Sequence, residues 1–167
     1  MGYMPVITNL AAPLIDHATR DAKGGRYKAV KFSSFSEMGQ ALRQGDIDVG
    51  FMIAPLPIVL RQQGEKIKVV MIGARHESTW VVRKDLHIKS LQDLVGKKVA
   101  VPLRFSGHNL AVHRLLIKHD LLGQIDVVEM NPPDMAAALA SGVLDSYFVG
   151  EPFAAKTIMN GQSEVLY

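Results

Sequence analysis

The sequence predicts an α/β protein whose parallel-rich sheets are flanked by helices and divided between two lobes. The first observation is an internal repeat: Glu37–Pro55 and Pro133–Pro152 carry nearly the same pattern, at an offset of 97 positions. The matched pairs are Met38 with Met135, Ala41 with Ala138, Leu42 with Leu139, Gly45 with Gly142, Asp48 with Asp145, Phe51 with Phe148 and Pro55 with Pro152. The same shift relates residues 2–55 to 99–152, so we expect two similar lobes.

The second observation is that each copy contains a helix followed by a strand. In the first copy, Ser34 and Glu37 have the spacing of a capping box, and Gly45 ends the helix because glycine enters the left-handed conformation without a steric penalty. Ile47–Ile53 follows as a strand that is apolar on both sides, which is typical of a parallel sheet covered by helices. The second copy repeats this order, with Asp134 as the cap, Gly142 as the stop and Leu144–Val149 as the strand.

The remaining elements follow the same alternation of patterns. Further strands are predicted at Tyr3–Ile7, Tyr27–Phe32, Lys66–Ala74, Trp80–Arg83, Lys97–Pro102, Ile125–Met130 and Val165–Tyr167. Further helices are predicted from Thr8 or Asn9 through Ala18, from Pro55 through Leu60, from Ser90 to before Gly96, over Leu110–His119 and over Phe153–Met159. The polar run Arg75–Thr79 predicts the crossing between the lobes, which gives residues 1–79 and 80–167.

Composition excludes several classes of protein. With 48% apolar and 21% charged residues the chain is an ordinary globular protein, and its net charge of +3 is too small to indicate a nucleic-acid surface. The longest apolar run, near Val49–Leu60, contains two prolines and is shorter than the roughly 20 residues of a membrane span. The absence of cysteine excludes disulfides, thiolate metal sites and cysteine nucleophiles.

Polar turns at the carboxyl ends of the predicted strands are the candidate ligand site. In open parallel sheets, ligands collect where helix N-termini present free N–H groups. Arg104–Asn109, RFSGHN, is the best single candidate because it combines a cation, neutral donors and a glycine. Ser106 has an alternative role as a helix cap. Glu151 follows a buried strand and needs a partner, for which Arg104 and Lys156 are as good candidates as a ligand.

Metal and catalytic sites are not indicated. The closest histidine pairs, His108 with His113 and His113 with His119, are five and six residues apart, so a helix does not place them on one face. No nucleophile elbow, phosphate loop or dinucleotide fingerprint occurs, and no cofactor is expected. Trp80 is interpreted as packing near the crossing between lobes rather than as a ligand-stacking residue.

Three segments together resemble a known family: VVRKDLHIKSLQDLVGKKVAVP, GKKVAVPLRFSGHN and PPDMAAALASGVLDSYFVGEPFAAK. They resemble the substrate-binding proteins of ABC importers in the nitrate, sulfonate, taurine and bicarbonate group, which is also similar to thiamine-precursor binding proteins. The resemblance covers essentially the whole chain. It implies a type II periplasmic binding protein fold that closes on a small solute and presents it to a membrane permease.

The resemblance also implies which residues face the ligand. They are Thr8, Asn9, Ser33, Ser34, Pro55, His76, Ser78, Thr79, Arg104, Ser106, Gly107, His108, Asn109 and Glu151. Family members have a signal peptide, a strand before Gly2 and a carboxyl-terminal segment that returns to the first lobe, none of which this chain shows. We therefore expect a fragment whose first lobe lacks part of its sheet, and a full-length protein in the periplasm or outside the cell, with or without a lipid anchor.

Two functions from different classes follow. The first is non-catalytic capture of a small anionic or zwitterionic solute between the lobes for an ABC permease, with no nucleic acid partner and no membrane span. The second is an enzyme on the same fold, of the type that makes the thiamine pyrimidine or acts in menaquinone synthesis. The pyrimidine synthase that the family resembles uses a cysteine-rich segment, so the lack of cysteine favours the first function.

Overall fold

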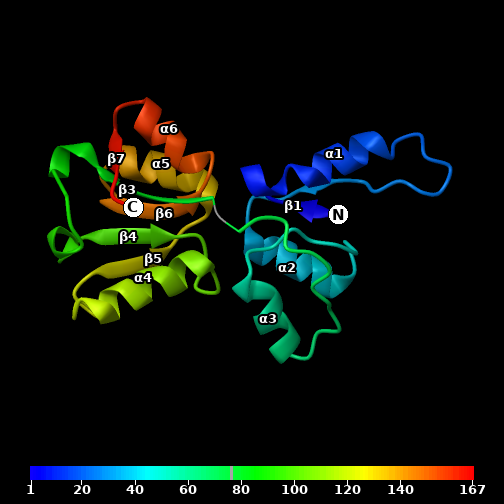
Figure 1. Ribbon diagram of the computed structural model, residues 1–167, viewed down its shortest axis with the longest axis horizontal. Coiled ribbons are helices and arrows are strands. Elements are labelled where there is room, and N and C mark those ends of the chain that lie inside the picture. The colour runs from blue at the N-terminus through cyan, green and yellow to red at the C-terminus, as the bar shows by residue number, and fades with distance from the viewer. Residues whose placement is uncertain (76) are drawn as a thin grey trace. The chain divides into compact units, whose positions relative to one another are not determined.

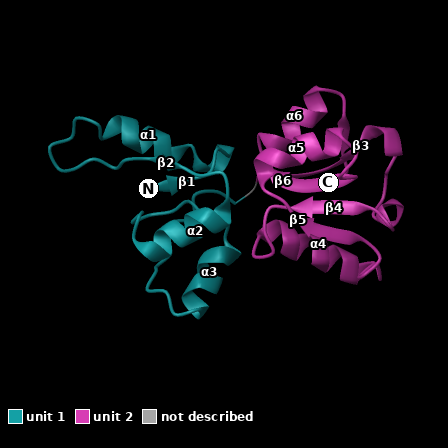
Figure 2. Cartoon of the chain, turned by 180° about the vertical axis from the view of Figure 1, so that it is seen from behind, with its two compact units in different colours: residues 1–76 teal, residues 77–167 magenta. Residues whose placement is uncertain are grey.

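The chain forms two compact units, residues 1–76 and 77–167, which are coloured separately in Figure 2. The structure is a computed structural model that describes residues 1–75 and 77–167. The boundary expected after Thr79 lies inside the first strand of the second unit, β3 (Ser78–Arg83). Each unit is considered by itself below.

Unit 1 holds a two-stranded parallel sheet and three α-helices (Figure 1). Gly2 pairs with Val30 and Tyr3 with Lys31, and a single further bridge joins Gly2 to Gly50. The elements are β1 (Gly2–Tyr3), a 3₁₀ turn (Ile7–Asn9), α1 (Ala11–Ala18), β2 (Val30–Lys31), α2 (Phe35–Gln44) and α3 (Pro55–Gln62).

Helix α2 begins and ends as the sequence predicts. The Ser34 hydroxyl accepts hydrogen bonds from the N–H groups of Ser36 and Glu37, which satisfies two donors that the first turn leaves without carbonyl partners. At the other end Gly45 adopts φ = 80°, a left-handed conformation that favours glycine. Met38, on the inner face, is fully buried.

Two predicted strands of unit 1 are wrong. The segment 47–53 makes only the bridge at Gly50, and the segment 66–74 forms no strand. Four consecutive side chains of the second segment are exposed: Val69 by 67%, Val70 by 83%, Met71 by 60% and Ile72 by 72%. Their residue types favour a strand, but a strand also needs a neighbouring backbone, and the described part of unit 1 pairs none with this segment.

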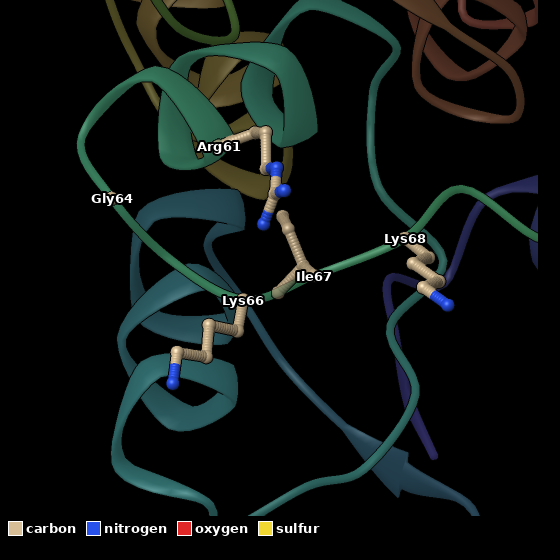
Figure 3. Close-up of a pocket in the computed structure, with 5 residues that line it drawn as sticks. All are labelled: Arg61, Gly64, Lys66, Ile67 and Lys68. Carbon is tan, nitrogen blue, oxygen red and sulfur yellow. The ribbon is translucent and has the colours of Figure 1, made fainter.

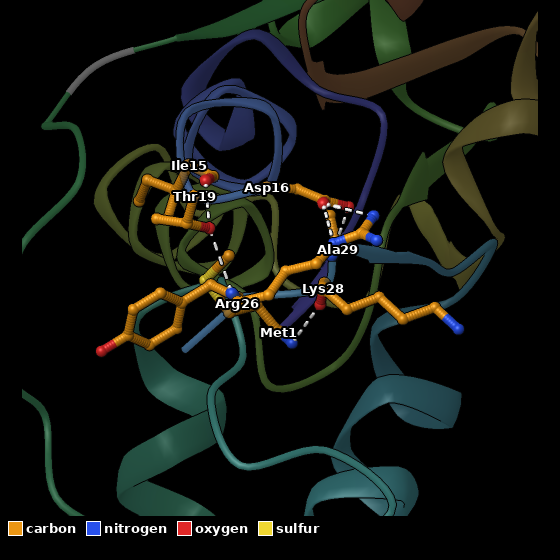
Figure 4. Close-up of polar contacts among 8 residues, drawn as sticks. Met1, Ile15, Asp16, Thr19, Arg26, Lys28 and Ala29 are labelled. Atoms are coloured by element: carbon orange, nitrogen blue, oxygen red, sulfur yellow. Dashed lines mark hydrogen bonds and ion pairs between the residues drawn. The ribbon is translucent and has the colours of Figure 1, made fainter. Parts of the chain in front are cut away.

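The long connection between α1 and β2 is held to the end of α1 by polar contacts (Figure 4). Asp16 accepts two hydrogen bonds from the Arg26 guanidinium, at 3.0 and 2.8 Å, and one from the Ala29 N–H at 2.9 Å. These donors hold the pKa of Asp16 below its usual value, the Ala29 N–H being the larger cause. Thr19 Oγ1 accepts from the Tyr27 N–H at 3.1 Å, so the connection is anchored at several points.

Unit 2 is a five-stranded mixed sheet in the order β5-β4-β6-β3-β7. Strand β4 is parallel to β5 and β6, whereas β3 is antiparallel to β6 and β7, so the sheet is parallel in one half only. The elements are β3 (Ser78–Arg83), 3₁₀ turns at Lys84–Leu86 and Gln92–Leu94, β4 (Lys98–Val101), α4 (Gly107–Lys118), β5 (Asp126–Glu129), α5 (Pro132–Ala140), β6 (Ser146–Gly150), α6 (Phe153–Met159) and β7 (Ser163–Val165).

The sheet of unit 2 is buried on both faces, which explains the continuous apolar strands. Successive side chains of a strand point to opposite faces. On one face Trp80 and Val82 pack with residues of α4, and on the other Val81 packs with residues of α5 and α6. Figure 1 shows α4 on one side of the sheet and α5 with α6 on the other.

Most elements of unit 2 match the prediction, with small corrections. In the second copy of the repeat Met135 is fully buried, and Gly142 has φ = 77°, close to that of Gly45. The helix predicted from Ser90 is only the 3₁₀ turn Gln92–Leu94, because the Asp93 carboxylate binds the N–H groups of residues 89 and 90 and closes a tight turn. The last strand lies at Ser163–Val165, two residues earlier than expected.

Candidate ligand-binding site

The turn before α4 caps the start of that helix through side-chain hydrogen bonds. Ser106 is fully buried, and its hydroxyl accepts a hydrogen bond from the Asn109 N–H at 3.0 Å. Asn109 in turn donates from Nδ2 to the Arg104 carbonyl at 2.9 Å. The N–H groups of Gly107 and His108, at the start of the helix, have no carbonyl partner within the described chain. Ser106 therefore acts as a cap, and the free donors belong to the backbone.

His108 connects this helix start to the first strand of the unit. Its Nε2 lies 2.8 Å from the Ser78 hydroxyl, and its ring meets Phe148 edge-on at 5.0 Å between ring centres. The side chain is only 8% exposed, and burial lowers the pKa of His108 to about 4, so the imidazole is neutral at neutral pH. Nδ1 is buried and has no hydrogen-bond partner in the described part of the chain.

A buried polar atom without a partner is costly, by about 1–3 kcal/mol. Nδ1 of His108 therefore has a hydrogen-bonding capacity that the described chain does not satisfy. The ring also contributes an apolar edge to the aromatic pair formed by Phe148 and Trp80, which stack with ring centres 5.4 Å apart. Trp80 is fully buried and donates from Nε1 to the Ser146 hydroxyl, so its predicted packing role is correct.

Glu151 lies at the carboxyl end of β6. Its Oε1 accepts from the Thr79 hydroxyl at 2.8 Å, and its Oε2 accepts from the Ala155 N–H at 2.9 Å, in the first turn of α6. Of the two alternatives for Glu151, an ion pair with Arg104 or Lys156 is not found within the described chain, where its partners are the Thr79 hydroxyl and the Ala155 N–H. Glu77 lies across the strand pair, and its carboxylate packs against Gly150 so closely that an added Cβ would collide with it.

Arg104 and Gly107 contribute less to a ligand site than the sequence suggests. The Arg104 side chain is 68% exposed, and its Nε donates to Glu129, the last residue of β5, at 2.8 Å. Its charge is thus already paired at the surface. Gly107 is not required for close approach of a neighbour, because a Cβ added there would meet nothing within 4 Å.

The candidates in unit 1 lie in a 3₁₀ turn and at the starts of α2 and α3. Asn9 is buried, accepts from the Met4 N–H at 3.1 Å through Oδ1, and donates to the Thr8 hydroxyl at 3.4 Å. Ser33 donates to Glu37, whereas Ser34 caps α2 and Pro55 is the first residue of α3. His76 lies outside the described residues.

The structure therefore brings together three groups of predicted residues in unit 2. These are Ser78 with His108, Thr79 with Glu151, and Arg104 with Ser106 and Asn109. Sequence reasoning missed Phe148 as a neighbour of these groups, because the repeat identified it only as a core position. The resemblance includes Glu77 in the ligand-facing turn of residues 76–79 but gives it no role of its own.

Other features do not add a metal or a deep pocket here. Within residues 1–75 and 77–167, no group of three or more histidines and carboxylates is placed to hold a metal ion. A hollow of about 620 Å³ lies in unit 1 and is lined by Arg61, Gly64, Lys66, Ile67 and Lys68 (Figure 3). In that view Arg61 lies over Ile67, while both lysines point outward. No helix of the described chain is long and apolar enough to cross a bilayer.

Comparison with known proteins gives a consistent answer. The taurine-binding periplasmic protein of Escherichia coli (strain K12) is 30% identical over 125 residues, which cover 73% of this chain and 38% of that protein. The ligand-binding component of an ABC-type import system from Staphylococcus aureus, solved with zinc bound, is 26% identical with a TM-score of 0.87, covering 99% of this chain and 58% of that one. The periplasmic nitrate-binding protein of Synechocystis PCC 6803, 18% identical with a TM-score of 0.82, shares the fold over 99% of this chain and 49% of its own.

These matches agree with the α/β class and with the resemblance seen in the sequence. The chain spans less than half the length of the curated relative and a little over half of the solved S. aureus protein. The model of the NMT1-like family matches residues 1–163. The chain belongs to the NMT1-like family.

Proposed function

We propose that this chain is the solute-binding part of an ABC import system and captures a small anionic or zwitterionic solute. Family membership supports the class of protein, and the relatives are named for binding and import rather than for catalysis. The single observation that carries the site is His108, whose buried Nδ1 lacks a partner at the start of α4. The whole protein would act in the periplasm or at the cell surface and deliver its solute to a permease.

The chemistry around His108 suits an anion. The N–H groups at the start of a helix attract negative charge, and α4 presents those of Gly107 and His108. The Ser78 and Thr79 hydroxyls lie on the adjacent strand. Glu151 lies at the end of the same strand pair and forms no ion pair within the described chain. Each of its oxygens accepts one hydrogen bond and keeps a second lone pair, so its negative charge would attract an ammonium group. A zwitterionic solute would place its anionic group at the start of α4 and its ammonium group at the carboxylate end of the site.

Binding is favoured over an enzymatic reaction by the state of the Ser78–His108 pair. The 2.8 Å distance is that of a nucleophile and its base, but a catalytic base is oriented by a third group at its other nitrogen. Nδ1 has no such partner in the described chain, and the lowered pKa of His108 makes it a weak base. Ser78 and His108 are therefore suited to forming hydrogen bonds with a bound solute rather than to transferring a proton.

The test is calorimetric titration of the chain with taurine, an alkanesulfonate, nitrate and bicarbonate. We expect one of these to bind, and Ser78→Ala to weaken it at least about tenfold, as expected for a lost polar contact. Ser141→Ala is the matched control, because the hydrogen bond of that hydroxyl within the described chain is to the Ala138 carbonyl near the end of α5. Equal affinities of both variants would place the solute elsewhere.

Arg104→Ala tests whether the arginine or the Ser78–His108 pair contributes more to solute binding. Since Arg104 is paired with Glu129 at the surface, we expect its removal to change affinity less than Ser78→Ala does. Ser106→Ala removes the cap of α4 and should weaken both helix and binding. If Arg104→Ala abolishes binding and Ser78→Ala does not, the anion is held by the arginine and the assignment to His108 and Ser78 is wrong.

A further inference from the structure

The connection from Thr19 to Lys31 concentrates positive charge in unit 1. It contains five cations, Arg20, Lys23, Arg26, Lys28 and Lys31, and one acidic residue, Asp21. All six of these side chains belong to exposed residues. Only Arg26 forms an ion pair within the described chain, with Asp16 at 2.8 Å. The other four cations form no ion pair there, although the charge of Arg20 also helps to lower the pKa of Asp16.

The charges are presented by an anchored segment rather than by a free tail. Asp16 holds Arg26 and the Ala29 N–H, and Thr19 holds the Tyr27 N–H. In Figure 4 the Lys28 side chain extends away from these contacts. Because the anchoring contacts use the backbone and Arg26, the other cations stay available, and less conformational entropy is lost when they meet a partner.

Apolar groups accompany the cations. Tyr27 is 56% exposed and lies between Arg26 and Lys28 in the chain, and Leu14 on α1 is 65% exposed. A tyrosine has an apolar ring and a polar end, a combination enriched where a bilayer meets water. Cations beside such a ring are the pattern that binds negatively charged lipid headgroups.

We propose that the segment 19–31 of unit 1 binds the anionic headgroup surface of a lipid bilayer. A nucleic acid is less suited, because base recognition uses stacking platforms or groove-reading side chains, and this segment has a single tyrosine. This proposal uses none of the residues assigned to the solute site and does not depend on the proposed import function. It would keep the protein close to a membrane without a spanning helix.

The test is co-sedimentation of the 167-residue chain with vesicles of phosphatidylcholine alone and of phosphatidylcholine mixed with phosphatidylglycerol. We expect binding only to the mixed vesicles and release by salt, because headgroup attraction is screened within a Debye length. Each cation near an anionic surface strengthens binding by roughly fivefold. The triple variant Lys23→Gln/Lys28→Gln/Lys31→Gln should therefore lower the partition coefficient roughly 100-fold.

The matched control is the triple variant Lys84→Gln/Lys89→Gln/Lys118→Gln, which removes the same charge from exposed positions of unit 2. We expect it to bind the mixed vesicles as the unaltered chain does. Absence of binding by the unaltered chain, or an equal loss in both triple variants, would refute the proposal. Binding to a single-stranded oligonucleotide as tight as to the mixed vesicles, lost in the first variant, would also refute it in favour of a general polyanion surface.

Discussion

The neutral, buried His108 makes a quantitative prediction about stability and pH. Its pKa is about 4 in the folded chain, and 6.5 is its ordinary value, which applies when the chain is unfolded. The unfolded chain therefore binds the extra proton first as the pH falls. The contribution of the neutral ring is fully present above pH 6.5 and is lost progressively toward pH 4.

The magnitude follows from the two pKa values. Each unit of difference corresponds to about 1.4 kcal/mol, so the full effect below pH 4 is roughly 3 kcal/mol, and about 2 kcal/mol of it falls between pH 7 and pH 5. We expect the free energy of unfolding of unit 2 to drop by that much more in the unaltered chain than in His108→Gln. Glutamine does not titrate, so the comparison isolates this one proton.

Urea unfolding at pH 7 and pH 5, followed by Trp80 fluorescence, measures this difference. Trp80 is the only tryptophan, is fully buried in unit 2 and stacks on Phe148, which contacts His108. His119→Gln is the control, an exposed histidine at the end of the same helix. If His108→Gln loses as much stability between the two pH values as the unaltered chain, the imidazole is not held neutral by burial, and the reasoning fails.

Two further predictions concern packing. Gly2→Ala should destabilise unit 1 by about 1–3 kcal/mol, because the added Cβ would lie 2.6 Å from the Ile47 side chain, whereas a Cβ at Gly107 has open space and Gly107→Ala should cost nothing. Thermal unfolding followed by circular dichroism compares the two variants, and equal effects would contradict the packing of β1. Thr157→Val should destabilise unit 2 by about 1–3 kcal/mol, because the Thr157 hydroxyl forms hydrogen bonds with the hydroxyls of Tyr147 and Ser163, at 2.6 and 2.8 Å, inside the core. An unchanged urea midpoint of unfolding would show that this buried network contributes nothing to stability.

The elements that could be predicted are those determined by local chemistry. Helix α2 is bounded by a serine cap and by Gly45, and both act through neighbouring backbone groups, so the sequence contains the whole explanation. The fully buried Met135 and the left-handed Gly142 follow from the same reasoning applied to the repeat. Helix α6 has the predicted bounds, Phe153–Met159.

The features that could not be predicted depend on partners distant in the sequence. The segment 66–74 has strand-forming residues but no adjacent backbone, and residue pattern alone does not reveal that absence. Ser78 and His108 were both site candidates, but their contact joins residues 30 positions apart and arises only when α4 packs on the sheet. Glu151 paired with Thr79, not with a cation, because β3 and β6 lie side by side in antiparallel register.

The exposed run Val69–Ile72 has a consequence for handling the protein. Four consecutive apolar side chains on a segment whose N–H groups have no backbone partner in the described chain can add to any free sheet edge they meet. The flanking Lys68 and Arg75 are cations that oppose such stacking at low salt. The isolated chain should therefore remain dispersed in dilute, low-salt buffer and precipitate as β-rich aggregates when salt screens those charges.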